Sequence, residues 1–204
     1  PKQENFALEE SSVPTPKHGE LLIRTLFMSL DPYMRGRMRL GPSYATPLQP
    51  GDVMTGEVVA RVEQSKSSQY SIGDIVRSPI GWQEWAAVSD HSVNRVDLSL
   101  GPVSTAVGVL GMPGLTAYHG LLDIGQPKAG DTLVVSAASG AVGAVVGQIG
   151  KINGCNVIGI AGSEKKCNYV TNDLEFDAAI NYKTQEVSSE LKRLSPNGVD
   201  VYFD

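Results

Sequence analysis

The sequence predicts an α/β chain, in which a small barrel or folded β-sheet precedes a doubly wound parallel sheet with helices on its faces. Three observations predict this class. Residues 1–100 read as short β segments broken by glycine and proline turns. Residues 126–204 alternate strand and helix patterns, and a glycine-rich turn joins their first strand to their first helix. We expect two domains, with residues 1–105 in the first and residues 106–204 in the second.

In the first domain, apolar and β-branched runs predict short strands, and a stretch rich in proline and glycine separates the first two. The predicted strands are Glu20–Leu30, Val53–Val62, Ile75–Arg77, Gln83–Val88 and Ser92–Val96. Strands of this length and spacing, with glycine and proline at the turns, favour a small barrel.

In the second domain, apolar runs at Thr132–Ser136, Val157–Ala161, Ala178–Tyr182 and Val199–Phe203 predict four buried parallel strands. Helices are expected between them, over Gly140–Asn153, from an N-cap at Ser163 to about Leu174, and around Val187, Leu191 and Leu194. The first helix has an apolar stripe at helical spacing, made of Val142, Val145, Val146, Ile149 and Ile152.

The turn after the first of these strands carries the second and third glycines of a G-x-G-x-x-G motif, Gly140 and Gly143, with Ala138 in the first place. Gly140 allows backbone to approach a pyrophosphate, Gly143 allows the helix to lie close on the strand, and the helix N-terminus offers N–H groups to phosphate. Gly147 and Gly150 continue the glycine face inside the helix, where each costs about 1 kcal/mol relative to alanine. The strand–turn–helix context therefore favours a dinucleotide site over a glycine face that serves packing alone.

The second strand of this domain ends in Gly162, where an NAD site has an acidic residue for the ribose hydroxyls. Lys165 and Lys166 follow in the first turn of a helix, where a cation is unfavourable unless an anion binds there. A 2′-phosphate held by Ser163 and Lys166 fits this pattern, so we predict NADPH rather than NADH. The alternative is that both lysines form a solvated face, and Glu164 weakens the NADPH interpretation.

The net charge of −5 gives the chain no excess of basic charge that would attract nucleic acid or an anionic membrane. The chain is 41% hydrophobic and 19% charged, as in ordinary globular proteins, and no apolar run reaches the roughly 18 residues of a membrane span. Cys155 and Cys167 are expected to be inert thiols of a reducing compartment, which predicts a cytoplasmic location.

Five segments together resemble the medium-chain dehydrogenase/reductase superfamily, and more narrowly its zinc-independent, NADPH-dependent alkenal/one double-bond reductases. The segments are Ser29–Met38, Gly111–Tyr118, Ala137–Lys151, Phe176–Lys183 and Gly198–Asp204. The resemblance covers the whole chain. It implies a GroES-like partial barrel followed by a Rossmann domain, with the active site in the cleft between them.

The resemblance also implies roles for individual residues. Ala141, Val142, Gly143 and Ala144 match the pyrophosphate turn, Lys166 matches the lysine for the 2′-phosphate, and Tyr182 matches a tyrosine beside that phosphate. Met112 and Thr116 fall near the nicotinamide, and Tyr33, Pro79 and Ile80 fall where relatives line the substrate pocket. The relatives' catalytic tyrosine falls beyond Asp204, so no catalytic residue is assigned, and Tyr33 is the substitute candidate.

No cysteine or histidine lies between Gly19 and Asp90, so the catalytic zinc site of the superfamily's alcohol dehydrogenases cannot be built there, and we expect no metal. The expected reaction is NADPH-dependent reduction of the carbon–carbon double bond of an α,β-unsaturated ketone or aldehyde. Two alternatives stay open: an NADPH:quinone oxidoreductase, and a non-catalytic NADPH-binding module.

A Rossmann sheet has six strands, whereas the sequence predicts four and stops one residue after the fourth. We therefore expect the chain to be truncated after its fourth strand. The resemblance also implies a homodimer at full length.

Overall fold

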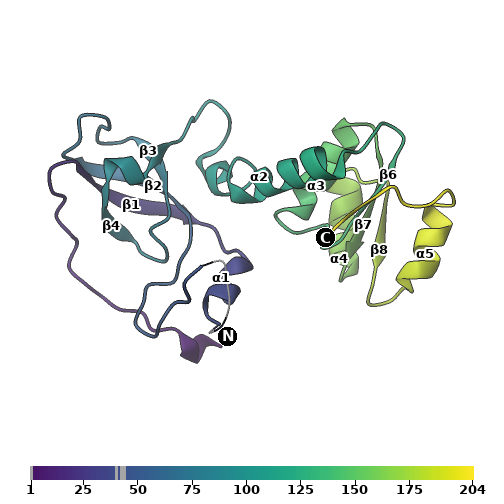
Figure 1. Ribbon diagram of the computed structural model, residues 1–204, viewed down its shortest axis with the longest axis horizontal. Coiled ribbons are helices and arrows are strands. Elements are labelled where there is room, and N and C mark those ends of the chain that lie inside the picture. Colours follow the sequence, from purple (N-terminus) through teal and green to yellow (C-terminus); the bar gives the residue numbers. More distant parts are fainter. Residues whose placement is uncertain (1, 40, 42–44) are drawn as a thin grey trace. The chain divides into compact units, whose positions relative to one another are not determined.

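The computed structural model describes residues 2–39, 41 and 45–204, and it divides the chain into two compact units (Figure 1). Unit 1 comprises Pro1–Val107, and unit 2 comprises Gly108–Asp204. Unit 1 is built on an antiparallel sheet and unit 2 on a parallel sheet with helices, so the predicted fold class is confirmed.

Unit 1 holds a five-stranded antiparallel sheet in the order β4-β1-β2-β3-β5. Its strands are β1 (Glu20–Met28), β2 (Val58–Ser65), β3 (Ile75–Ser78), β4 (Trp85–Ser89) and β5 (Asn94–Arg95). Alternate residues of β2, namely Val58, Ala60 and Val62, are fully buried, and they pack with Leu21 and Ile23 of β1. Val59, which lies between them, is also fully buried and packs with Ala106 and Val107 of η3 (Val103–Val107), so this part of β2 is covered on both faces.

The predicted strand over Val53–Val62 begins later than expected, at Val58. The preceding residues pair instead with a turn, because the Met54 and Gly56 carbonyls accept hydrogen bonds from the N–H groups of Trp82 and Gly81. The sequence did not predict any helix between β1 and β2, but α1 (Tyr33–Arg37) forms one helical turn there. The described part of the unit also contains three short 3₁₀ helices: η1 (Gln3–Asn5), η2 (Asp90–Ser92) and η3 (Val103–Val107).

Unit 2 holds a four-stranded, wholly parallel sheet in the order β8-β7-β6-β9. Its strands are β6 (Thr132–Val135), β7 (Asn156–Ala161), β8 (Ala178–Asn181) and β9 (Val201–Phe203). Its helical segments are α2 (Met112–Tyr118), η4 (His119–Gly125), α3 (Gly143–Ile152), α4 (Glu164–Asn168), η5 (Tyr169–Asp173) and α5 (Val187–Leu194). All four strands predicted in this part of the chain are therefore present.

Both faces of the parallel sheet are covered, as a doubly wound sheet requires. On one face, Val134, Ile158 and Ile180 lie against the apolar side of α5. On the other face, Leu133 and Val157 pack in a larger cluster to which α2 and α3 contribute. Alternate residues of β6 thus serve the two faces, and this explains why the strand is an uninterrupted apolar run.

The buried side of α3 is formed by glycine rather than by the predicted apolar stripe alone. Gly143, Val146, Gly147 and Gly150 are buried, whereas Ile152 is 84% exposed. The prediction for Ile152 was wrong because the helix presents its smallest residues to the sheet. A β-carbon on Gly147 would lie 1.8 Å from Cζ of Phe176, which fills the space that the glycine leaves.

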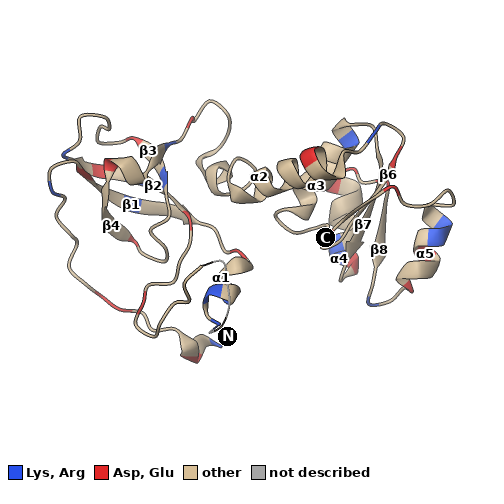
Figure 2. Cartoon of the chain, viewed as in Figure 1, with Lys and Arg blue, Asp and Glu red and all other residues tan. Residues whose placement is uncertain are grey.

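Acidic and basic residues are distributed over both units (Figure 2). Among residues 2–39, 41 and 45–204, no helix is long and apolar enough to cross a membrane.

Candidate functional site

The carboxyl ends of β6, β7 and β8 bring together the residues predicted for the pyrophosphate and the 2′-phosphate, whereas Met112 and Thr116 lie on α2. Because the three strands are parallel neighbours, the segments that follow them begin at one edge of the sheet. Gly140–Ala144 follow β6, Ser163 and Lys166 follow β7, and Tyr182 follows β8 directly. This edge is the first candidate site.

The turn between β6 and α3 is tight, and its glycines are required by sterics. Ala137 adopts a left-handed backbone with φ of 43°, and its carbonyl accepts a hydrogen bond of 2.7 Å from the N–H of Gly140. A β-carbon on Gly143 would lie 2.6 Å from that same carbonyl oxygen, and one on Gly140 would lie 3.0 Å from it. Real β-carbons do not approach as closely as 2.6 Å, so Gly143 cannot be replaced without moving the turn.

The start of α3 leaves backbone donors available for an anion. Within the described chain, no hydrogen bond from the N–H groups of Ala141, Val142 or Gly143 to protein is found. The first N–H groups of a helix lack an intrahelical acceptor, and together with the helix dipole they favour a negatively charged group. The turn can therefore offer these backbone N–H groups to an anion such as a phosphate.

A third glycine, Gly159 in β7, supports this turn from the neighbouring strand. The N–H of Ala138 donates to the carbonyl of Ile160 at 3.1 Å, and a β-carbon on Gly159 would lie 2.9 Å from the Ala138 side chain. Ala138 thus replaces the first glycine of the motif because β7 gives it room. Sequence reasoning missed Gly159, although a glycine inside a buried strand signals close approach.

At the tip of β7, Gly162 and Tyr182 lie against each other. A β-carbon on Gly162 would lie 2.8 Å from Oη of Tyr182. The ring is 55% exposed, so its other side faces solvent. Gly162 was noted in the sequence only as a missing acid, and its contact with Tyr182 was not predicted.

Ser163 caps α4, as predicted, with its Oγ accepting a hydrogen bond of 3.3 Å from the N–H of Lys166. The α-helical part ends at Asn168, and η5 continues it to Asp173, close to the expected end at Leu174. Lys165 and Lys166 are exposed beside the cap. A serine hydroxyl, an ammonium group and a phenol therefore surround the tip of β7, and all three can donate to a phosphate.

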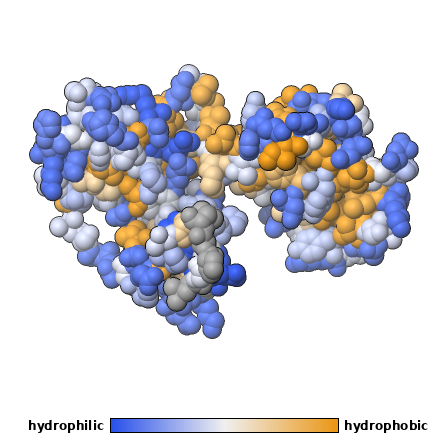
Figure 3. Space-filling model, viewed as in Figure 1, coloured by the Kyte–Doolittle hydropathy of each residue, from blue (hydrophilic) through white to orange (hydrophobic). Residues whose placement is uncertain are grey.

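Met112 and Thr116 lie one turn apart on α2, both exposed, and the Thr116 hydroxyl donates to the Met112 carbonyl at 2.8 Å. Leu110 and Leu115 are also exposed in this segment, so its outer side is largely apolar (Figure 3).

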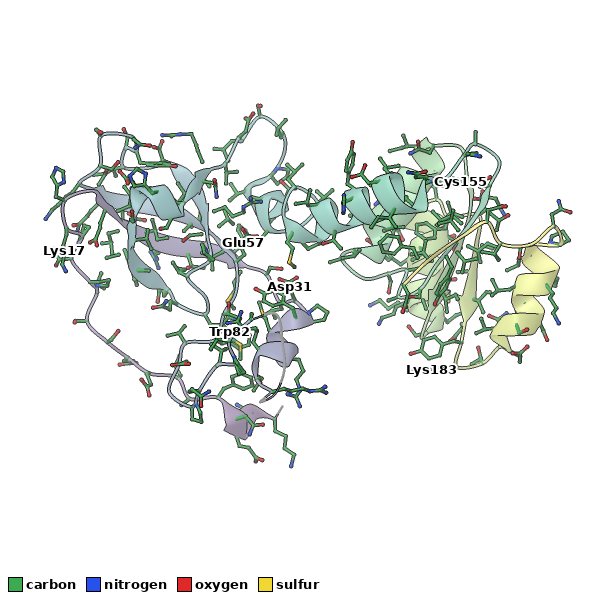
Figure 4. The ribbon with its side chains drawn as sticks, in the orientation of Figure 1. Lys17, Asp31, Glu57, Trp82, Cys155 and Lys183 are labelled. Carbon is green, nitrogen blue, oxygen red and sulfur yellow. The ribbon has the colours of Figure 1, made fainter. Side chains whose placement is uncertain are left out.

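In unit 1, Tyr33 begins α1, and Pro79 and Ile80 directly follow β3. Ile80 is half-buried and packs against the barrel core, whereas Pro79 is exposed. Both segments lie around Trp82, which is labelled in Figure 4 together with Asp31 and Glu57.

Glu57 and Arg77 form an ion pair in the same unit, with 2.9 Å between the Glu57 Oε1 and the Arg77 Nε. Burial raises the pKa of Glu57, Arg77 opposes that rise, and the negative charge of Asp31 adds to it. The Asp31 carbonyl also accepts a hydrogen bond from the N–H of Met34 in the first turn of α1. Sequence reasoning missed this pair because its members lie twenty positions apart, Glu57 directly before β2 and Arg77 in β3.

Both cysteines are buried, free thiols. Burial raises the pKa of Cys155 and Cys167, so they stay protonated and are poor nucleophiles at neutral pH. Among the residues that the structure describes, no three or more His, Cys, Asp or Glu side chains are grouped to hold a metal ion.

Two family models match the chain. A model described as the N-terminal domain of oxidoreductases matches residues 1–96, and one described as zinc-binding dehydrogenase matches residues 141–204. All of the chain aligns with an NADPH-dependent curcumin reductase of Escherichia coli, at 50% identity over 59% of that protein. All of it also aligns with prostaglandin reductase 1 of mouse, at 45% identity over 61% of that protein.

Among solved structures, the chain is similar to CurA of Vibrio vulnificus in complex with NADPH. The TM-score is 0.94 at 50% identity, and the match covers 100% of this chain and 60% of that one. The chain therefore spans about 60% of the length of the relatives that it matches.

Proposed function

The chain belongs to the zinc-independent group of medium-chain dehydrogenases/reductases that contains the curcumin and prostaglandin reductases, and from this premise we propose that the whole protein is an NADPH-dependent enone reductase. It would reduce the carbon–carbon double bond of α,β-unsaturated ketones or aldehydes. The observation that carries the proposal is the match of the whole chain, at 44–50% identity, to curcumin and prostaglandin reductases, together with a match of 91% of the chain, at 42% identity, to an NADP⁺-dependent 2-alkenal reductase. In this proposal, residues 1–105 serve the substrate and residues 106–204 bind NADPH.

The turn before α3 supports the dinucleotide part of the proposal. Gly140 and Gly143 leave no side chain over it, and the N–H groups of Ala141, Val142 and Gly143 supply donors for the pyrophosphate, with Ala144 beside them. A phosphate bound there gains from the positive end of the α3 dipole, without any basic side chain in the turn.

The tip of β7 supports NADPH rather than NADH. Ser163 and Lys166 would hold the 2′-phosphate, and Tyr182 would flank it from its position against Gly162. An acidic residue at position 162 would repel that phosphate, and the chain has glycine there. Met112 and Thr116 are proposed to lie near the nicotinamide.

When bound, NADPH supplies the hydride that is added to the β-carbon of the substrate. Negative charge then moves to the carbonyl oxygen, and a hydrogen-bond donor must stabilise it. Tyr33 is the candidate donor within this chain, and Pro79 and Ile80 are proposed to line the substrate's apolar part. The absence of Cys and His between Gly19 and Asp90 agrees with an enolate stabilised by hydrogen bonds rather than by zinc.

The test uses the complete protein, NADPH and two acceptor classes. We expect NADPH oxidation with an enone or enal such as curcumin, and a reduced carbon–carbon bond in the product by mass spectrometry. Turnover with quinones but not with enones would make the protein a quinone reductase. Tight NADPH binding, measured by cofactor fluorescence, with no turnover of either class would make it a non-catalytic NADPH-binding module.

Two finer properties belong to the same proposal. We propose a homodimer, which the kinship to this group supports, and light scattering of the complete protein measures its mass in solution. We also propose a cytoplasmic location, supported by two free, buried thiols that are typical of reducing compartments. Fractionation of the source cells tests it.

A further inference from the structure

Trp82 lies where three segments of unit 1 meet. Its ring stacks on Phe6 of the N-terminal segment, with centroids 5.4 Å apart and an interplanar angle of 16°. Its other neighbours are Gly56 and Met34: a β-carbon on Gly56 would lie 3.3 Å from the Trp82 Cδ1 and 3.0 Å from the Met34 Cε. The indole and the buried thioether of α1 therefore both lie against Gly56, in the space that a side chain at this position would need.

The turn that carries Trp82 is fixed by backbone hydrogen bonds. The Gly81 N–H donates to the Gly56 carbonyl at 2.9 Å, and the Trp82 N–H donates to the Met54 carbonyl at 2.8 Å. Gly81 has φ of 79°, and a β-carbon there would lie 2.3 Å from the Met54 oxygen, so only glycine fits. Gln83 adds a side-chain hydrogen bond of 2.6 Å to the Ile80 carbonyl.

The proposed substrate-lining residues lie on α1 and on the turn that carries Trp82. Tyr33 directly precedes Met34 in α1, and Ile80 directly precedes Gly81 in the turn. A shift of α1 relative to the turn would therefore move Tyr33 relative to Ile80. The packing that opposes such a shift is that of Met34 and Trp82 around Gly56, and Phe6 stacks on the indole.

We infer that Trp82, covered by Phe6, is a positioning residue for the acceptor: it holds α1 and the Pro79–Ile80 turn in the relative placement that binds an α,β-unsaturated carbonyl compound. The inference rests on the proposed function, and it assigns no direct contact between the indole and the substrate. In this inference, the affinity for the acceptor depends on a cluster of residues from four separate stretches of sequence. They are Phe6, Met34, Gly56 and Trp82.

Trp85 provides a matched control. It is a tryptophan three positions later, on β4, and the Arg24 guanidinium carbon lies 5.3 Å from its ring centroid. Its removal costs aromatic surface in the same unit without changing the residues that surround Gly56.

The experiment measures KM for an enone and Kd for NADPH in the complete protein. For Trp82→Ala we expect KM to rise about tenfold, which corresponds to about 1.4 kcal/mol, with Kd for NADPH unchanged. Trp82→Phe keeps an aromatic ring against Phe6 and Met34 and is expected to restore most of the affinity, whereas Trp85→Ala leaves KM unchanged. An unchanged KM in Trp82→Ala, an equal rise in Trp85→Ala, or no rescue by phenylalanine would overturn the inference.

A second readout does not need turnover. The ε-methyl of Met34 and the indole both lie against Gly56, so the inference predicts that the NMR signal of this methyl is displaced by the ring current and loses that displacement in Trp82→Ala. Addition of an enone to the NADP⁺ complex should move this signal in the wild type, and an unmoved signal despite enone binding would contradict the inference. A wild type that turns over no enone refutes the proposed function instead, so the two failures are distinct.

Discussion

The phenol of Tyr182 occupies the space that a side chain on Gly162 would need, since a β-carbon at position 162 would lie 2.8 Å from its oxygen and 3.0 Å from the nearest ring carbons. The two residues end neighbouring parallel strands, β7 and β8. A side chain at position 162 would therefore have to displace the Tyr182 ring. The place where an NAD site has a carboxylate is filled here by a hydrogen-bond donor.

Gly162→Asp is therefore expected to reverse the cofactor preference. The carboxylate displaces the Tyr182 ring and repels a 2′-phosphate, so Kd for NADPH should rise about tenfold or more, equivalent to ~1.4 kcal/mol per factor of ten. Fluorescence titration with NADPH and NADH measures both constants. Gly162→Ala is the control, because it displaces the ring without adding charge. Equal weakening of both cofactors in both variants would show that steric displacement, not charge, sets the preference.

Lys166→Gln is expected to weaken NADPH binding about tenfold while leaving NADH binding unchanged, because it removes a charge near the proposed 2′-phosphate. The preference for NADPH should also fall as salt is added, since Lys166 is exposed and its attraction is screened. Lys192→Gln, on α5, removes the same charge from an exposed site. If both variants lower NADPH affinity equally, the effect is one of net charge, and Lys166 holds no phosphate.

Elements that follow from local pattern were predictable from the sequence. The apolar run of β6 predicts a buried strand, and Gly143 predicts the close approach of α3 to it. By contrast, α1 contains Gly36 and two arginines in five residues, so it has no apolar periodicity that would predict a helix. Its formation depends on the burial of Met34 in the folded unit, and the local sequence does not predict that burial.

The features of the candidate site also divide into those that a local pattern predicts and those that depend on the tertiary structure. Ser163 was predictable as a cap because serine is preferred directly before a helix, where its oxygen accepts a hydrogen bond from an N–H of the first turn. The contacts of Gly162 with Tyr182 and of Gly159 with Ala138 join residues on different strands or turns, and only the strand order brings them together. Ile152 was misassigned because periodicity assumes that the largest side chains face the sheet, and here glycines do.

The cap of α5 makes the stability of this helix dependent on pH. The carboxylate of Glu186 accepts hydrogen bonds from the N–H groups of Ser188 and Ser189, at 3.1 and 2.7 Å. Hydrogen bonds from the Ser189 side chain and from both backbone N–H groups hold the pKa of Glu186 below its ordinary value.

Because this pKa is lowered on folding, the cap stabilises the helix above the ordinary glutamate pKa, and that contribution is lost as pH falls through the lowered one. Carboxyl ¹³C NMR should give Glu186 a midpoint below that of glutamate in an unfolded peptide. Ser189→Ala should bring the midpoint back toward the ordinary value, because it removes the largest cause. A midpoint at or above the ordinary value in the wild type would refute the role of the cap.

The last prediction concerns the glycine face of α3. Gly147→Ala would place a β-carbon 1.8 Å from Cζ of Phe176, a ring that is only 3% exposed. Overpacking of this kind costs about 1–3 kcal/mol, and the gain of about 1 kcal/mol in helix propensity offsets only part of it. Urea unfolding of the complete protein should therefore show a lower midpoint.

Two further variants separate overpacking from other causes. Phe176→Leu in the Gly147→Ala background shortens the ring side chain, so the two substitutions should be coupled and the pair more stable than the sum of the single losses predicts. Gly36→Ala is the matched control, because position 36 is also helical, is free of positive φ and has no atom within 4 Å of a new β-carbon. It should be neutral or stabilise by up to about 1 kcal/mol. If Gly147→Ala were to stabilise the protein as much as Gly36→Ala does, the close packing of α3 on Phe176 would be disproved.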